Sequence, residues 1–168
     1  MFELGQTVMY GTEGVCTVER IEVMKVNRVR MKYYVLKPVY RDNATVFVPM
    51  DNELLISRMR PILTREEIDS ILEHLHDETF AWIEDHNERR QTFQGILNAG
   101  NCVQVLRMIC ALYLRRQELT ARGKHLRSSD EQMLREAEKL LNDEFAWVLQ
   151  LTRQEVPAYI RSRVEQSA

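Results

Sequence analysis

The sequence predicts an α+β protein, with a small N-terminal β-barrel over residues 1–60 and a compact all-helical domain over residues 61–168. Short runs rich in Val, Ile, Thr and Tyr, bounded by Gly, Asn, Asp or Pro, fill the first fifty residues. Such runs are typical of strands joined by tight turns. Beyond Pro61, apolar residues recur at helical spacing and capping motifs replace the strand-like runs.

Four or five strands in fewer than fifty residues are too few for two stacked sheets, but they can curl into a small barrel. Alternation along the runs predicts an apolar inner layer. Its expected members are Val8, Tyr10, Val18, Ile21, Val23, Tyr34, Leu36, Val46 and Val48. Val18 is out of step with Ile21 and Val23, so a bulge or bend is predicted between Val18 and Ile21.

The helical part begins after a segment, residues 51–60, that loses strand character. Thr64 and Glu67 form a capping box that starts the first helix. A second helix carries Phe80, Ile83, Phe93 and Leu97. It is predicted to end at Gly100, which suits a left-handed C-terminal cap.

Three further helices are expected after Gly100. Asn101 can cap a strongly apolar helix that stops near Gly123 and is predicted to be central in the bundle. Residues 128–131 read as a second capping box that opens the next helix. Thr152 and Glu155 indicate a last helix, whose start is expected to be kinked or late because of Pro157.

Composition narrows the class of protein. The chain has 168 residues, of which 45% are hydrophobic and 29% charged, as in an ordinary soluble protein that can bury a core. No apolar run is long enough to span a bilayer, and the N-terminus lacks the pattern of an export signal, so a cytoplasmic protein without a membrane partner is expected. Cys16, Cys102 and Cys110 lie in apolar runs, which predicts reduced, buried thiols. We also expect a monomer.

The net charge of −2 hides a segregated pattern. Residues 61–85 carry eight acidic residues and one basic residue, whereas residues 86–127 carry two acidic and eight basic residues. The second of these stretches, called here the basic block, is the candidate for binding phosphates. The alternative is a solvated face whose charges pair with the acidic helices of the same bundle.

No stretch has the pattern of a catalytic, cofactor or metal site, so we expect neither an enzyme nor a cofactor. His74 and His76 lie beside Asp77, but residues two apart do not share a helix face, and a solvated helix end is expected instead. Tyr113 lies between apolar neighbours and is expected to be a core residue rather than a stacking platform for bases.

The first half of the chain resembles a known module. Its opening run Phe2-Glu3-Leu4-Gly5-Gln6-Thr7-Val8-Met9-Tyr10, the following Glu13-Gly14-Val15 and the closing Val46-Phe47-Val48-Pro49 are similar to the CarD family of bacterial transcription regulators. That module is shared with transcription-repair coupling factor. The resemblance implies a Tudor/SH3-like barrel.

The second half also resembles the family, up to about Phe145. The similar stretches are the surroundings of Arg89, then Asn98-Ala99-Gly100-Asn101, Val105-Leu106-Arg107, Leu112-Tyr113-Leu114-Arg115-Arg116 and residues 128–141. Barrel and helical domain in this order are more specific than a small barrel alone.

The resemblance implies an adhesive function without catalysis. The family's barrel docks on the β subunit of RNA polymerase through an exposed strand edge, for which it implies Met24, Lys25, Thr45, Val46 and Phe47 here. Phe47 stands where some relatives carry a basic residue. It could contact the partner or simply pack against the barrel.

The family's helical domain reaches promoter DNA and shifts the equilibrium between closed and open promoter complexes. The residues that the resemblance and the basic block imply for DNA are His86, Arg89, Arg90, Arg115, Arg116, Lys124 and Arg127. His86 occupies the place of the family's wedge tryptophan. Trp82, four residues earlier, could replace that wedge or be a core residue. If the wedge is lost, the alternative function is a polymerase-binding adaptor without DNA insertion.

Overall fold

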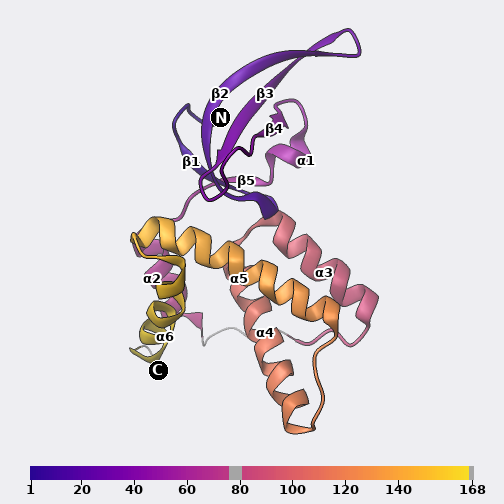
Figure 1. The fold of residues 1–168 in the computed structure, drawn as a ribbon, viewed down its shortest axis with the longest axis vertical. Coiled ribbons are helices and arrows are strands. Elements are labelled where there is room, and N and C mark those ends of the chain that lie inside the picture. Colours follow the sequence, from indigo (N-terminus) through magenta and orange to yellow (C-terminus); the bar gives the residue numbers. More distant parts are fainter. Residues whose placement is uncertain (76–80, 167–168) are drawn as a thin grey trace. The chain divides into compact units, whose positions relative to one another are not determined.

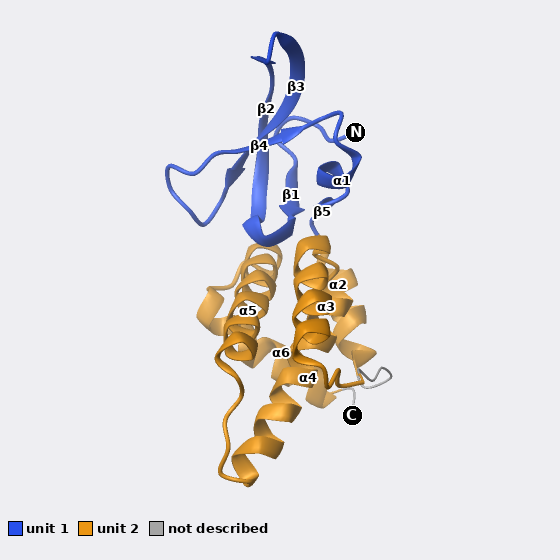
Figure 2. Ribbon diagram, turned by 90° about the vertical axis from the view of Figure 1, so that its right-hand side faces the viewer, with its two compact units in different colours: residues 1–62 blue, residues 63–168 orange. Residues whose placement is uncertain are grey.

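The computed structural model describes residues 1–75 and 81–166, and the chain divides into two compact units, Met1–Ile62 and Leu63–Ala168 (Figure 2). The first unit is a five-stranded antiparallel sheet with one short helix (Figure 1). The second unit is built from helices. This arrangement confirms the predicted fold class. None of the described helices is long and apolar enough to cross a membrane.

The sheet has the strand order β4-β3-β2-β1-β5. Its elements are β1 (Thr7–Tyr10), η1 (Gly11–Glu13), β2 (Gly14–Val26), β3 (Val29–Pro38), β4 (Val46–Pro49), α1 (Glu53–Ile56) and β5 (Met59–Pro61). The expectation that residues 51–60 lack a strand was wrong, because β5 pairs with β1. A strand of three residues is too short to leave an alternating pattern in the sequence.

The inner layer of the sheet was predicted in part. A buried cluster contains Val8, Tyr10, Cys16, Val18, Tyr34, Leu36, Val48 and Met59. The pairing of β2 with β3 shifts register between Val18 and Arg20, which confirms the predicted bulge. Ile21 and Val23 were wrongly placed in this layer, since they are 41% and 54% exposed.

Strand length explains the exposure of Ile21 and Val23. β2 and β3 continue as a hairpin beyond the residues that pair with the short strands β1 and β4 (Figure 1). Among the described strands, β1 pairs with β2 only up to Thr17 and so ends before Ile21, while β4 pairs with β3 only from Tyr33 to Leu36 and does not reach the pair of Val23 and Lys32. Asn27 and Arg28 close it with positive φ values of 50° and 66°, a turn whose twist matches that of the strands. The hairpin therefore projects from the curled part of the sheet.

The helical unit contains α2 (Arg65–Glu73), α3 (His86–Ala99), α4 (Cys102–Ala121), α5 (Ser128–Leu149), η3 (Arg153–Glu155) and α6 (Val156–Gln166). α4 packs against α5, and α2 against α6. The caps at three helix ends were predicted correctly, but the Thr64 capping box is only half formed, because Glu67 does not accept the N–H of Thr64. The Thr64 and Asn101 side chains accept the N–H groups of Glu67 and Gln104 at 3.1 Å, and Gly100 is left-handed with φ 71°.

Two helix starts differ from the prediction. α3 begins at His86 and is capped by Asp85, so Ile83 precedes the helix, while Phe80 lies outside the described residues. The capping box predicted at residues 128–131 is not formed, because α5 begins at Ser128 and has no side-chain cap. Asp130, expected in that box, binds another side chain instead.

The last helix starts late, as predicted. Thr152 and Glu155 form a capping box that opens η3. α6 follows from Val156, which places Pro157 in its first turn. Proline is tolerated there because the first N–H groups of a helix have no partner within the helix.

Thiol reactivity gives a first testable prediction. Cys16 is fully buried in the sheet unit, and burial, followed by the nearby Glu13 carboxylate, raises its pKa to about 12. Raising the pKa from 9.0 to about 12 leaves roughly a thousandfold less thiolate at pH 8. We expect Ellman's reagent at pH 8 to label Cys16 only after urea is added. Rapid labelling of Cys16 in the native protein, located by peptide mass mapping, would contradict the burial of its thiol.

Candidate functional site

The edge of the sheet at β4 is open, since among the described residues β4 pairs only with β3. Met50 donates its N–H to the C=O of Lys32 at 2.9 Å. Because antiparallel backbones alternate between facing the neighbour and facing away, Phe47 directs its N–H and C=O away from β3. Pro49, the other residue of β4 with this orientation, has no N–H to offer. The edge therefore presents unpaired backbone groups around Phe47.

The side chain of Phe47 begins an apolar strip along one face of the hairpin. It is 42% exposed, and its ring meets Tyr33 edge-on with centroids 6.4 Å apart. The Tyr33 hydroxyl donates to the sulfur of Met31 at 3.8 Å, and Met31 lies opposite Met24 in the pairing of β2 with β3. Phe47, Tyr33, Met31 and Met24 together form what we call the apolar strip.

The residues expected to bind polymerase divide between the two faces of the sheet. By the strand registers, Met24 and Phe47 share the face of the apolar strip, and Thr45 precedes Phe47 by two residues. Lys25 is adjacent to Met24 and lies on the opposite face. Val46 packs against the buried cluster. The backbone of β4 and the apolar strip therefore form one continuous candidate surface.

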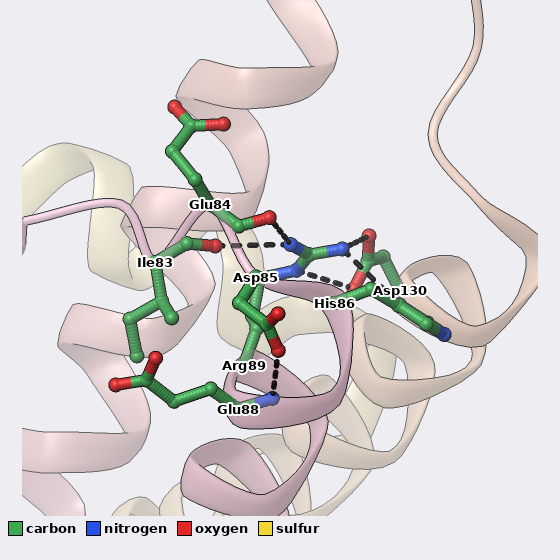
Figure 3. Close-up of polar contacts among 7 residues, drawn as sticks. All are labelled: Ile83, Glu84, Asp85, His86, Glu88, Arg89 and Asp130. Atoms are coloured by element: carbon green, nitrogen blue, oxygen red, sulfur yellow. Dashed lines mark hydrogen bonds and ion pairs between the residues drawn. The ribbon is translucent and has the colours of Figure 1, made fainter.

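In the helical unit, Arg89 lies at the start of α3 and is only 4% exposed. Its Nε and Nη2 donate to the two carboxylate oxygens of Asp130 at 3.0 and 2.8 Å (Figure 3). Its Nη1 donates to the C=O groups of Ile83 at 2.9 Å and Glu84 at 3.3 Å, and Nη2 lies 3.4 Å from Nδ1 of His86. The Arg89 guanidinium is thus used inside the protein, and we remove Arg89 from the residues that could bind phosphates.

Trp82 precedes α3 in a segment without regular secondary structure, so it does not lie on a helix with His86. Its indole ring is half-buried and meets the buried Phe93 with centroids 6.4 Å apart. The guanidinium carbons of Arg89 and Arg115 lie 4.7 and 5.6 Å from its centroid. Cation–π contacts therefore restrain the ring that the resemblance offered as a possible wedge.

One cavity of about 260 Å³ brings several of the expected DNA residues together. Trp82, Arg115 and Arg127 line it. Arg115 projects from α4, and Arg127 is the residue before α5. His125, which sequence reasoning did not single out although it lies in the basic block, lines the same cavity.

The other expected basic residues lie elsewhere in the unit. The guanidinium of Arg116 is 4.9 Å from the Tyr113 ring and 4.0 Å from a carboxylate oxygen of Glu131. Arg90 and Lys124 are exposed, and within residues 1–75 and 81–166 their side chains make no hydrogen bond or ion pair. They remain available to an external anion.

Two further expectations concern single residues. Tyr113 was wrongly expected in the core, since it is 38% exposed and its hydroxyl donates to Glu138. Burial, followed by the Glu138 hydrogen bond, raises the pKa of Tyr113 to about 12. His74 is at the end of α2, with Nδ1 2.8 Å from the C=O of Ser70, whereas His76 and Asp77 lie outside the described residues.

Comparison with known families agrees with both units. Residues 2–62 match the CarD-like/TRCF RID domain, a Tudor-like module that interacts with RNA polymerase, and residues 70–161 match the CarD C-terminal domain. A Tudor-like sheet followed by this helical unit defines a transcription-associated, RNA polymerase-interacting protein. The chain belongs to the CarD family.

Proposed function

We propose that this protein binds the β subunit of RNA polymerase through β4 and modulates the stability of open promoter complexes through its helical unit. The observation that carries the first half is the open edge at Phe47, whose backbone N–H and C=O point away from β3. A strand of the partner can pair with such an edge. The apolar strip beside Phe47 adds contact area for the partner's side chains.

The side chains of the apolar strip determine how binding to the partner depends on salt. Phe47, which is 42% exposed, and the half-buried Met31 supply aromatic and thioether groups rather than charges, so their contacts gain from apolar burial. Tyr33 is itself buried and supports the Phe47 ring from below. Binding through Phe47 and Met31 depends weakly on ionic strength, unlike binding through arginine or lysine. Lys25, on the opposite face, is not needed for it.

The test of the first half uses the full chain and the purified polymerase β subunit. Calorimetric titration at 50 and 300 mM NaCl is expected to show saturable binding whose affinity falls less than about tenfold between these salt concentrations. Absence of binding would contradict the proposal. A steeper fall would assign the contact to charged residues.

For DNA we propose the exposed cations of the basic block. Arg90 and Lys124 have the exposure that phosphate contacts require, and each such contact releases counterions from DNA. The Arg116 pair with Glu131 is long and partly exposed, so it is readily exchanged for a phosphate.

Changing Arg90 and Lys124 together to Glu is expected to shorten the lifetime of heparin-challenged open complexes made with this protein. The slope of log affinity against log salt is expected to fall by about one for each lost contact. Arg135→Glu is the control, since Arg135 is an exposed arginine of α5 outside the basic block. Equal effects of the control and the double variant would assign the result to net charge.

A second candidate function is a polymerase-binding adaptor without DNA insertion. It is favoured by the cation–π contacts that hold the Trp82 ring and by His86 in the family's wedge position. In that case Arg90 and Lys124 to Glu would leave open-complex lifetime unchanged while β-subunit binding persists. The open-complex lifetime measured with the double variant therefore distinguishes the two functions.

A further inference from the structure

The cavity at the start of α5 has charged walls that fall into two groups. Arg89 and Asp130 bind each other through two hydrogen bonds and neutralise each other. The remaining ionisable side chains of the lining are Glu84, Arg115, His125 and Arg127. With histidine neutral, these others sum to a net positive charge. The cavity is therefore suited to an anion.

The two arginines of this second group can be recruited by a ligand. The side chain of Arg115 is 28% exposed, and its ion pair is with Glu118 at 3.3 Å, where Glu118 is itself 59% exposed. Such a pair contributes little, so an anion can displace it. Among the described residues the Arg127 guanidinium has no hydrogen-bond or ion-pair partner.

The backbone beside the cavity adds to this preference. Arg127 is the N-cap of the 22-residue helix α5, yet no side chain caps the first turn. The carboxylate of Asp130, which could have done so, is taken by Arg89. The first N–H groups of α5 are therefore left without a side-chain cap at the wall formed by Arg127, while Asp130 and Glu131 in the same turn offset part of the helix dipole.

We propose that this cavity binds one phosphate group of the DNA backbone, with Arg115 and Arg127 as its two guanidinium ligands. This inference rests on the proposed approach of the helical unit to DNA. Two planar guanidinium groups match phosphate oxygens through paired hydrogen bonds. The volume of about 260 Å³ exceeds that of a phosphate group and leaves room for the attached sugar beside Trp82 and Leu119.

The indole N–H resonance of Trp82 offers a direct readout, and Trp147 on α5 provides an internal reference outside the cavity lining. The full chain, labelled with ¹⁵N, is titrated with inorganic phosphate, a duplex oligonucleotide, a single-stranded oligonucleotide and an RNA duplex of the same length. Trp147→Phe assigns the two signals. We expect duplex DNA to shift the Trp82 signal and to leave the Trp147 signal in place.

Arg127→Ala is expected to weaken duplex DNA binding about tenfold and to abolish the shift of the Trp82 signal. Arg135→Ala is the matched control, because Arg135 is an exposed arginine of α5 that lies outside the basic block and does not line the cavity. The control is expected to change affinity less than twofold. Arg115→Lys, which keeps the charge but loses the planar fork, is expected to fall between them.

The outcomes separate the cavity from the proposed function. DNA binding that leaves the Trp82 signal unmoved, or equal losses in Arg127→Ala and Arg135→Ala, would overturn the cavity site but not the approach to DNA. A shift of the Trp82 signal with phosphate or RNA, without any DNA binding, would show that the phosphate group bound in the cavity does not come from DNA. Absence of DNA binding, with the Trp82 signal unchanged by every probe, would overturn both statements.

Discussion

Asp130→Ala is expected to destabilise the helical unit by about 3–5 kcal/mol, because it leaves the Arg89 charge buried without its counterion. Arg89 is 4% exposed, and its two shortest side-chain hydrogen bonds to a charged group end on Asp130. The same guanidinium holds the C=O groups of Ile83 and Glu84, so the segment before α3 is expected to loosen as well.

Tryptophan fluorescence during urea unfolding measures this effect, since Trp82 and Trp147 both belong to the helical unit. Glu131→Ala is the control, because Glu131 lies on the same helix and its partly exposed pair with Arg116 has a 4.0 Å separation. That change is expected to cost less than about 1 kcal/mol. Equal losses in the two variants would contradict the role assigned to Asp130.

Replacing both partners separates the net value of the pair from the cost of breaking it. Arg89→Met with Asp130→Leu removes both charges and retains apolar volume. We expect this double variant to regain most of the stability lost in Asp130→Ala, because buried ion pairs often contribute little beyond an apolar substitute. A double variant as unstable as the single one would mean that the hydrogen bonds to Ile83 and Glu84 dominate.

Phe47→Pro is expected to weaken binding to the polymerase β subunit by more than about thirtyfold, the largest functional effect that we predict for a single residue. Proline removes the outward N–H of residue 47 and places its ring where a partner strand would lie. It is tolerated in the sheet itself, because an edge strand accepts proline where the N–H faces away from the neighbour.

Phe47→Ala isolates the side chain from the backbone. It removes the ring that contacts Tyr33 but retains the N–H, and we expect a five- to tenfold loss, on the order of 1–1.4 kcal/mol. Binding is measured by calorimetry with the full chain, and circular dichroism checks the fold. Equal affinities of Phe47→Pro and Phe47→Ala would exclude strand pairing.

Sequence reasoning was most accurate where neighbours along the chain decide the structure. Alternation over a few residues located the bulge after Val18, and the chemistry of single side chains located the caps at Thr64, Gly100 and Asn101. Caps and bulges form between residues a few positions apart, so their signals are contained in a short window.

The wrong predictions concern residues whose exposure is determined by segments distant in the sequence. Ile21 and Val23 alternate like core residues, but they are exposed because β1, which pairs with β2 only up to Thr17, ends before either of them. Tyr113 has apolar neighbours in sequence, yet it lies on the face of α4 that reaches Glu138. Local periodicity predicts which residues share a face but not whether another element covers that face.

By itself the sequence determined the two-part architecture, the family and the concentration of positive charge in the basic block, since composition, periodicity and motif order are properties of the chain alone. The tertiary structure decided which of those charges can meet a partner. Arg89 binds Asp130, 41 residues later, and cannot meet a partner, whereas Arg127 is exposed at the cavity. A buried charge needs a counterion close in space, and only the packing of α3 against α5 specifies which residue supplies it.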